Sequence, residues 1–261
     1  MKLIMALLIA FPVISNLVAQ DFSMYEKKVL IKGNDTLHYR IMYPLNFDHT
    51  KKYPLVIFLH GSGERGNDNS AQLVHGGEFF AQAGNRLNYQ AIVIFPQCPN
   101  NSSWVNFEEI NNPDNTNTFN FYPLKEPTKP MVLTMKLIKQ TLKESYIDKN
   151  RVYIGGLSLG GMGTFEILYR CPKIFAAAFP MCGGGNPKSA SKYAKRVKIW
   201  VFHGAKDDVV PPKYSEEMVE AIKKEGGDVK FTLYPEANHN CWDSAFAEPN
   251  LLPWLFSNAK K

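Results

Sequence analysis

The stretch Gly156-Leu157-Ser158-Leu159-Gly160 constrains the fold of this chain more than any other part of it. It follows the mostly apolar run Arg151-Val152-Tyr153-Ile154 after one further glycine and leads into residues 162–169, which have the composition of a helix. Glycines on both sides of Ser158 allow the backbone to turn sharply there without a Cβ clash. The pentapeptide alone also occurs by chance, so the strand before it and the helix after it are what make it informative. Together they predict a strand, a tight turn and a helix, with the Ser158 hydroxyl presented at the turn as a nucleophile.

Short apolar runs dominate the rest of the sequence. Residues 25–31 and 36–42 have the pattern of two strands, and the turn Lys32-Gly33-Asn34-Asp35 between them predicts an antiparallel hairpin. From Lys52 onward, apolar runs alternate with longer amphipathic segments. The apolar runs are residues 55–59, 91–95, 152–154, 176–179, 199–202 and 231–234. Continuously apolar strands are buried on both faces, so the pattern predicts an α/β fold with a mostly parallel sheet flanked by helices.

Two helices are predicted from apolar residues at helical spacing. Residues 128–146 repeat Met131, Met135, Ile138 and Leu142, a stripe that we interpret as core rather than as a cofactor site. A second helix is expected at about residues 214–225, because Gly226-Gly227 is a typical helix end. Residues 105–127 show no period. We expect a long surface loop near the site there, with disorder as the alternative.

The N-terminal residues 1–19 have the features of a signal peptide. Lys2 precedes an apolar run at residues 3–13, and Leu17-Val18-Ala19 before Gln20 has the form of a cleavage site. A membrane anchor is the alternative, but the apolar run is short for a span and Pro12 and Asn16 interrupt it. The sequence therefore predicts a secreted or periplasmic protein, with residues 20–261 as one catalytic domain and no stable membrane association after cleavage.

The charge and the cysteines exclude several function classes. Lys2 is the only charged side chain in residues 1–19, so cleavage would lower the formal net charge from +6 to +5. The lysines are scattered, which argues against nucleic-acid binding. The cysteines have no Cys-x-x-Cys spacing, which argues against a zinc site and against redox chemistry, and they lie beside apolar segments, as buried free thiols do. They are Cys98, Cys171, Cys182 and Cys241, and an exported chain would permit disulfides among them.

A nucleophilic serine requires a general base and an acid that orients the base. In an open α/β sheet these groups follow the nucleophile in the order acid, then histidine, on loops after strands. Asp207 follows the apolar run 199–202, and His239 follows the run 231–234. Asp208 is adjacent to Asp207 and is the alternative acid. A surface-loop histidine and a solvated turn would explain each residue alone, but their order and placement favour a catalytic role.

An oxyanion formed at Ser158 needs two backbone N–H donors. We predict that one is Leu159, directly after the nucleophile, and that the other is Ser62 in the loop His60-Gly61-Ser62-Gly63-Glu64-Arg65-Gly66. His60 is expected to brace this loop. A glycine-rich loop can also bind phosphate, but the Gly-Lys-Ser/Thr ending of a phosphate-binding loop is absent here.

Several of these segments together resemble the α/β-hydrolase superfamily, and within it the secreted carboxylesterase, feruloyl esterase and predicted-peptidase group. The segments are His60-Gly61-Ser62-Gly63-Glu64-Arg65-Gly66, Pro96-Gln97-Cys98-Pro99 followed by Trp104, Gly156-Leu157-Ser158-Leu159-Gly160-Gly161, His203-Gly204-Ala205-Lys206-Asp207 and His239-Asn240-Cys241-Trp242. The resemblance runs from about residue 53 to the C-terminus and implies the triad Ser158, Asp207 and His239. It also suggests that Trp104 and Trp242 flank the substrate pocket, with core packing as the alternative for both.

The expected activity is hydrolysis of carboxylic esters through an acyl-enzyme, without cofactor or metal. The expected substrate is a small-molecule or polysaccharide ester, with a short acyl or feruloyl group on plant polysaccharide preferred. A generalist short-chain carboxylesterase, a serine peptidase and a catalytically silent binding module are the alternatives. The sequence gives no basis for an oligomeric state.

Overall fold

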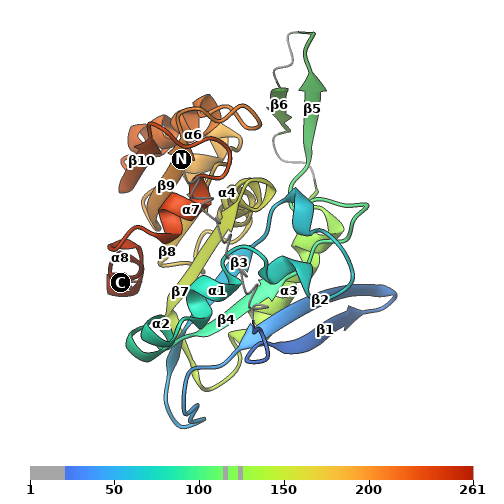
Figure 1. The fold of residues 1–261 in the computed structure, drawn as a ribbon, viewed down its shortest axis with the longest axis vertical. Helices are drawn as coiled ribbons and strands as arrows, with labels where there is room; N and C mark the ends of the chain where they lie inside the picture. The colour runs from blue at the N-terminus through green and yellow to red at the C-terminus, as the bar shows by residue number, and fades with distance from the viewer. Residues whose placement is uncertain (1–20, 114–116, 123–125, 261) are drawn as a thin grey trace, which may run out of the picture.

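The computed structural model describes residues 21–113, 117–122 and 126–260, so the predicted signal peptide, residues 1–19, lies outside the described residues. Eight strands form one sheet in the order β1-β2-β4-β3-β7-β8-β9-β10 (Figure 1). The strands are β1 (Glu26–Lys32), β2 (Asp35–Met42), β3 (Tyr53–Leu59), β4 (Ile92–Pro96), β7 (Ile147–Leu157), β8 (Ala177–Met181), β9 (Lys198–Gly204) and β10 (Val229–Tyr234).

The sheet is mostly parallel, as the apolar runs predict. All pairs from β4 to β10 are parallel, whereas β2 runs antiparallel to both β1 and β4. The N-terminal hairpin therefore extends one edge of the sheet, and Gly33 supplies the positive φ of 60° that its turn requires. Since the six remaining strands are parallel, their C-terminal ends meet at one edge, where loops can place side chains together.

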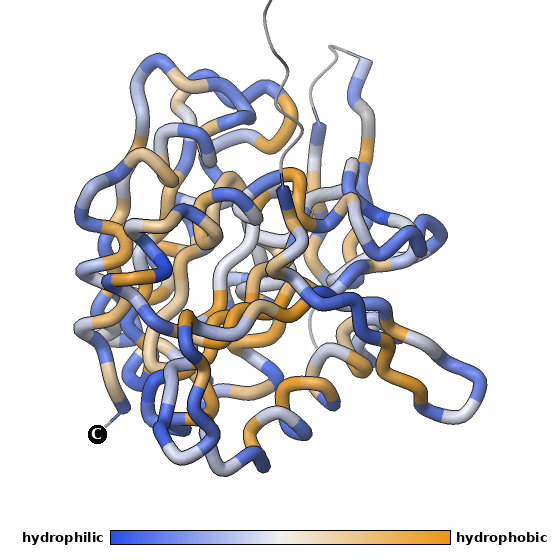
Figure 2. The backbone as a smooth tube through the Cα atoms, turned by 60° about the horizontal axis from the view of Figure 1, so that its bottom comes forward, coloured by the Kyte–Doolittle hydropathy of each residue, from blue (hydrophilic) through white to orange (hydrophobic). Residues whose placement is uncertain are grey.

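Each face of the sheet has its own hydrophobic core. Along β3, Leu55, Ile57 and Leu59 belong to one core and Val56 and Phe58 to the other, as strand geometry requires. Apolar backbone accordingly runs through the middle of the molecule and polar segments follow its surface (Figure 2). The first core is covered by α3 (Lys129–Thr141), α4 (Leu159–Arg170), α5 (Ala190–Tyr193) and α6 (Lys213–Lys224). Against the second core pack α1 (Gly77–Ala81), α7 (Cys241–Phe246) and α8 (Leu251–Ser257), and α2 (Ala83–Asn88) follows α1.

The expectation of a loop without regular structure at residues 105–127 was wrong. This segment contains a second, antiparallel two-stranded sheet of β5 (Phe107–Asn111) and β6 (Asn117–Phe121). The hairpin projects from the body of the molecule (Figure 1). Strand β6 is held to the body because Phe119 N donates to Tyr214 Oη at 2.7 Å and Asn117 Nδ2 donates to Val209 O at 3.3 Å. The hairpin therefore lies beside the loop that follows β9.

The helix predicted at residues 128–146 is shorter in the structure than the apolar pattern indicated. Helix α3 begins with Thr128 as its N-cap, whose side chain accepts from Met131 N, and ends at Thr141. Tyr146 O already accepts from Tyr53 N at 2.8 Å, so the chain must have left the helix to join the sheet there. The second helix matches its prediction closely, since α6 ends at Lys224 and Gly226 follows with a φ of 74°. None of the helices described is long and apolar enough to span a bilayer.

Candidate active site

Ser158 occupies the turn between β7 and α4, where its backbone has φ 52° and ψ −118°. Positive φ is costly for a residue with a side chain, so the surroundings must hold this turn in place. Ser158 N donates to Met181 O at 3.0 Å, which fixes the turn to the neighbouring strand β8. A Cβ on Gly160 would lie 1.9 Å from Leu59 O, and one on Gly156 would lie 2.3 Å from Gly160 O. The two glycines are therefore required by the close approach of three backbone segments.

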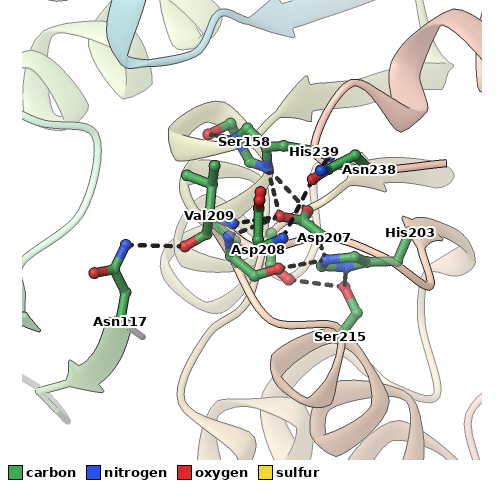
Figure 3. A network of polar contacts seen from close by, with 11 residues as sticks. Asn117, Ser158, His203, Asp207, Asp208, Val209, Ser215, Asn238 and His239 are labelled. Carbon is green, nitrogen blue, oxygen red and sulfur yellow. Dashed lines mark hydrogen bonds and ion pairs between the residues drawn. The ribbon is translucent and has the colours of Figure 1, made fainter. Parts of the chain in front are cut away.

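Asp207 and His239 reach Ser158 from the loops that follow β9 and β10. Gly204 lets the two loops meet, because a Cβ there would lie 2.3 Å from Asn238 O. His239 Nε2 lies 2.9 Å from Ser158 Oγ, and His239 Nδ1 lies 2.8 Å from Asp207 Oδ2 and 3.1 Å from Oδ1 (Figure 3). The structure thus joins the three residues predicted as a triad in one hydrogen-bonded series.

The adjacent Asp208 has a different environment. Its side chain is exposed, and its backbone N–H donates to Asn238 Oδ1 at 3.2 Å. Asp207 is only 6% exposed and accepts from Val209 N and Val210 N through Oδ1. Of the two candidate acids, the structure places Asp207 on the imidazole.

A second histidine, His203, contacts the acid from the protein interior. Its ring is fully buried, with Nε2 at 3.1 Å from Asp207 Oδ2 and 2.8 Å from Val210 O (Figure 3). Because both partners are acceptors, Nε2 carries a proton and donates it. The other ring nitrogen, Nδ1, lies 2.7 Å from Ser215 Oγ, which donates to Gly183 O. Asp207 is thus held between two imidazoles.

These contacts decide the charge of the acid. Burial by itself raises the pKa of Asp207, but hydrogen bonds from His203 and then from His239 outweigh it and lower the pKa to about 2. The carboxylate is therefore ionised at neutral pH and accepts the Nδ1–H of His239. That leaves Nε2 of His239 without a proton and facing Ser158 Oγ, as a general base requires.

We expect His203→Leu to lower kcat about 10- to 100-fold, because one hydrogen bond to a buried carboxylate is lost. KM should change little, since His203 is buried away from substrate. His203→Gln places an amide N–H near the position of Nε2 and should restore most of kcat. Steady-state kinetics on a soluble acetate ester measure both variants, with circular dichroism to confirm folding. A folded His203→Leu enzyme with the kcat of the parent would show that His203 does not position Asp207.

The two predicted oxyanion donors each begin a helix. Leu159 is the first residue of α4, and Ser62 is the first residue of a short 3₁₀ helix, Ser62–Glu64. The N–H groups of such residues have no acceptor inside their own helix and can point at a ligand. A Cβ added to Gly61 would lie 3.6 Å from Ser158 Cβ, so this loop directly faces the nucleophile.

His60 braces the loop of residues 60–66 through two contacts with the main chain. Its Nε2 accepts from Cys98 N at 2.9 Å, so its proton is on Nδ1, which lies 2.6 Å from Gly61 O. Burial lowers the pKa of His60 to about 4, which keeps the ring neutral. This arrangement fits the bracing role that we expected and leaves His60 without access to substrate.

The two tryptophans differ. Trp104 is fully buried, donates from Nε1 to His60 O at 3.0 Å and stacks edge-on against the His60 ring. It lies in the core behind the loop and does not line an open pocket, contrary to the expectation that it flanks the substrate. Trp242 is only partly buried, and its ring packs edge-on against His239 with centroids 5.5 Å apart. Trp242 remains beside the site.

The cysteines do not add a second chemistry. All four are buried free thiols in the structure, and burial raises the pKa of the Cys98 thiol to about 12. Ligand atoms of Cys182, Asp207 and His239 lie within 4.8 Å of one another and are a possible metal set. His239 already uses one ring nitrogen for Asp207 and the other for Ser158, so we assign no metal to these residues.

Sequence reasoning missed three side chains near the site: Glu64, His75 and His203. Glu64 and His203 lie inside segments that the resemblance had singled out, but neither has a motif that indicates its contacts with His75 and Asp207. His75 lies in a segment without any motif. Only the folded structure brings it to Glu64, with Nε2 at 3.7 Å from Oε1.

Comparisons with known proteins agree with this geometry. A model of the phospholipase/carboxylesterase family matches residues 47–248. The chain belongs to this family. The expected superfamily and the α/β-hydrolase fold are confirmed at the level of the family.

Three known proteins illustrate the similarity. A bifunctional acetylxylan esterase/xylanase of Neocallimastix patriciarum is 40% identical over 83 residues, covering 32% of this chain and 12% of the relative. A crystal structure of a thermostable esterase superposes with a TM-score of 0.79 at 33% identity, over 91% of this chain and 64% of that one. A ferulic acid esterase gives a TM-score of 0.62 at 16% identity, over 88% and 97%, which shows a shared fold alone. The chain thus spans less than two thirds of the first two.

Proposed function

We propose that this family member is an exported serine esterase that hydrolyses short acyl or feruloyl esters on plant polysaccharide. The observation that carries the proposal is the series Ser158 Oγ, His239 Nε2, His239 Nδ1 and Asp207, whose hydrogen bonds are 2.9 and 2.8 Å long. A serine hydroxyl is a weak nucleophile at neutral pH and needs such a base within hydrogen-bond reach.

In the first half of the reaction, Ser158 Oγ attacks the ester carbonyl carbon while His239 Nε2 takes its proton. The carbonyl oxygen gains a negative charge, which the N–H groups of Leu159 and Ser62 stabilise. The imidazolium is stabilised by the ionised Asp207, and it gives its Nε2 proton to the departing alkoxide. The products of this half are the free alcohol and an acyl group on Ser158.

In the second half, His239 accepts a proton from a water molecule that attacks the acyl carbonyl. The same two N–H groups stabilise the second oxyanion. Collapse returns the proton from His239 to Ser158 Oγ and releases the carboxylic acid, which restores the starting state.

Three observations support the substrate class. The relative of Neocallimastix patriciarum is described as an acetylxylan esterase, and its match is 40% over 83 residues. Trp242 presents an aromatic ring beside His239, where a sugar or an aryl group could pack. The N-terminal sequence predicts export, which would bring the enzyme to extracellular polymers.

Initial rates on a panel of substrates test the proposal, with Ser158→Ala as the blank. The panel is 4-nitrophenyl acetate, butyrate and octanoate, methyl ferulate, acetylated xylan and a peptide anilide. We expect turnover of the short esters, with ferulate or xylan turned over faster. Activity on short simple esters alone would identify a generalist carboxylesterase. Cleavage of the anilide would favour the peptidase, and no turnover of any ester would favour the binding module.

A further inference from the structure

The carboxylate of Glu64 lies close to Ser158 but is not part of the triad. Glu64 is at the end of the short helix that begins with the predicted oxyanion donor, and its side chain is only 13% exposed. The point where a Cβ of Gly61 would be is 3.0 Å from Glu64 Oε2 and 3.6 Å from Ser158 Cβ. Glu64 Oε2 and the nucleophile therefore border the same small space.

The two oxygens of this carboxylate have different neighbours. Oε1 faces His75 Nε2 at 3.7 Å, whereas no donor in the described part of the chain hydrogen-bonds Oε2. The neighbouring Arg65 donates instead to Ser62 O and Ser102 O. A carboxylate oxygen that is mostly removed from water gains from any donor that a ligand brings to it.

An aromatic surface continues from this carboxylate to the catalytic base. The rings of His75 and Trp242 have centroids 5.0 Å apart, and Trp242 packs in turn on His239 at 5.5 Å. In ester hydrolysis, His239 hands its proton to the departing alcohol, so the alcohol must lie beside this imidazole. Glu64, His75 and Trp242 thus lie on the side of the site where the alcohol leaves.

We propose that Glu64, His75 and Trp242 form a subsite for the alcohol part of the ester, selective for alcohols that carry a further hydroxyl group. Oε2 of Glu64 accepts a hydrogen bond from that hydroxyl, the His75 ring borders the subsite on the Oε1 side, and Trp242 packs against the carbon skeleton. Sugars meet these requirements, because each esterified position has hydroxyl groups next to it. This inference rests on the proposed esterase function and assigns the residues that would select its alcohol.

A matched pair of acetates tests the subsite. Propyl acetate and glycerol monoacetate have the same acyl group and a three-carbon alcohol, but only the second carries free hydroxyls. We expect the kcat/KM of the enzyme to favour glycerol monoacetate about 10-fold or more, which is the effect of one hydrogen bond to a charged group. Glu64→Gln keeps the shape and removes the charge, and should lower this ratio several-fold through KM.

Control measurements distinguish a failure of the alcohol subsite from a failure of the esterase function. Glu220→Gln, an exposed position on α6, should keep the parent's ratio. A ratio near one in an active parent enzyme, or a ratio that Glu64→Gln leaves unchanged, would overturn the subsite and leave the esterase intact. A preference for acetylcholine over both acetates would assign the carboxylate to cations and also overturn it. No turnover of any acetate above the Ser158→Ala blank would overturn the esterase function, and the subsite with it.

Discussion

Replacement of Ser158 by alanine is expected to lower kcat about 10⁵- to 10⁶-fold on any ester that the enzyme accepts. The loss is this large because the nucleophile and its base act as one unit, so removing one removes the covalent route altogether. The stability should change little, by less than about 1 kcal/mol, because Ser158 Oγ is bonded to His239 alone among the described side chains.

The measurement is single-turnover kinetics on 4-nitrophenyl acetate, together with thermal unfolding of both proteins. A fluorophosphonate probe should label the parent at Ser158 and leave the variant unlabelled. Ester turnover close to that of the parent in a folded variant would show that another residue is the nucleophile.

Asp207→Asn is expected to lower kcat about 10⁴-fold. An asparagine amide donates where the carboxylate accepts, so His239 would carry its proton on Nε2 and lose the ability to take one from Ser158. The amide NH₂ replaces one carboxylate oxygen, so it also faces one of two donors, Val210 N at Oδ1 or His203 Nε2 at Oδ2. We therefore expect an additional loss of about 1–3 kcal/mol in the free energy of unfolding.

Asp208→Asn is the matched control, because it removes the same charge one residue away. Its side chain is exposed, so kcat should stay within about twofold of the parent. Steady-state kinetics and chemical denaturation of the two variants give the comparison. The reverse ranking would assign the acid to Asp208.

The sheet could be predicted because its strands are buried on both faces. Residues such as Val56 and Ile57 point to opposite cores, and the resulting apolar runs stand out in the sequence. The β5–β6 hairpin was missed because it is half exposed and polar. Phe119 and Phe121 alternate with Asn120 there, but the many asparagines and prolines around this short strand pattern are typical of a loop.

The site was predictable where local sequence determines geometry. Ser158 has glycines that the turn requires, and Asp207 and His239 follow apolar strands in the expected order. His75 could not be found in this way, since nothing near it in the sequence indicates a partner. Trp104 was misplaced because a tryptophan beside a motif is equally consistent with the core and with a pocket, and only the bond from its Nε1 to His60 O decides.

The close backbone packing at Gly156 and Gly160 distinguishes residues that the fold requires from residues that catalysis requires. A side chain at either position would collide with main-chain atoms of β3 or α4, whether or not the protein catalyses anything. Ser158 itself meets no such packing demand. A homologue that had lost its catalytic activity would thus still need both glycines. Their presence in a sequence therefore indicates the fold and not the activity. Only Ser158, read together with Asp207 and His239, distinguishes a working hydrolase from an inherited scaffold.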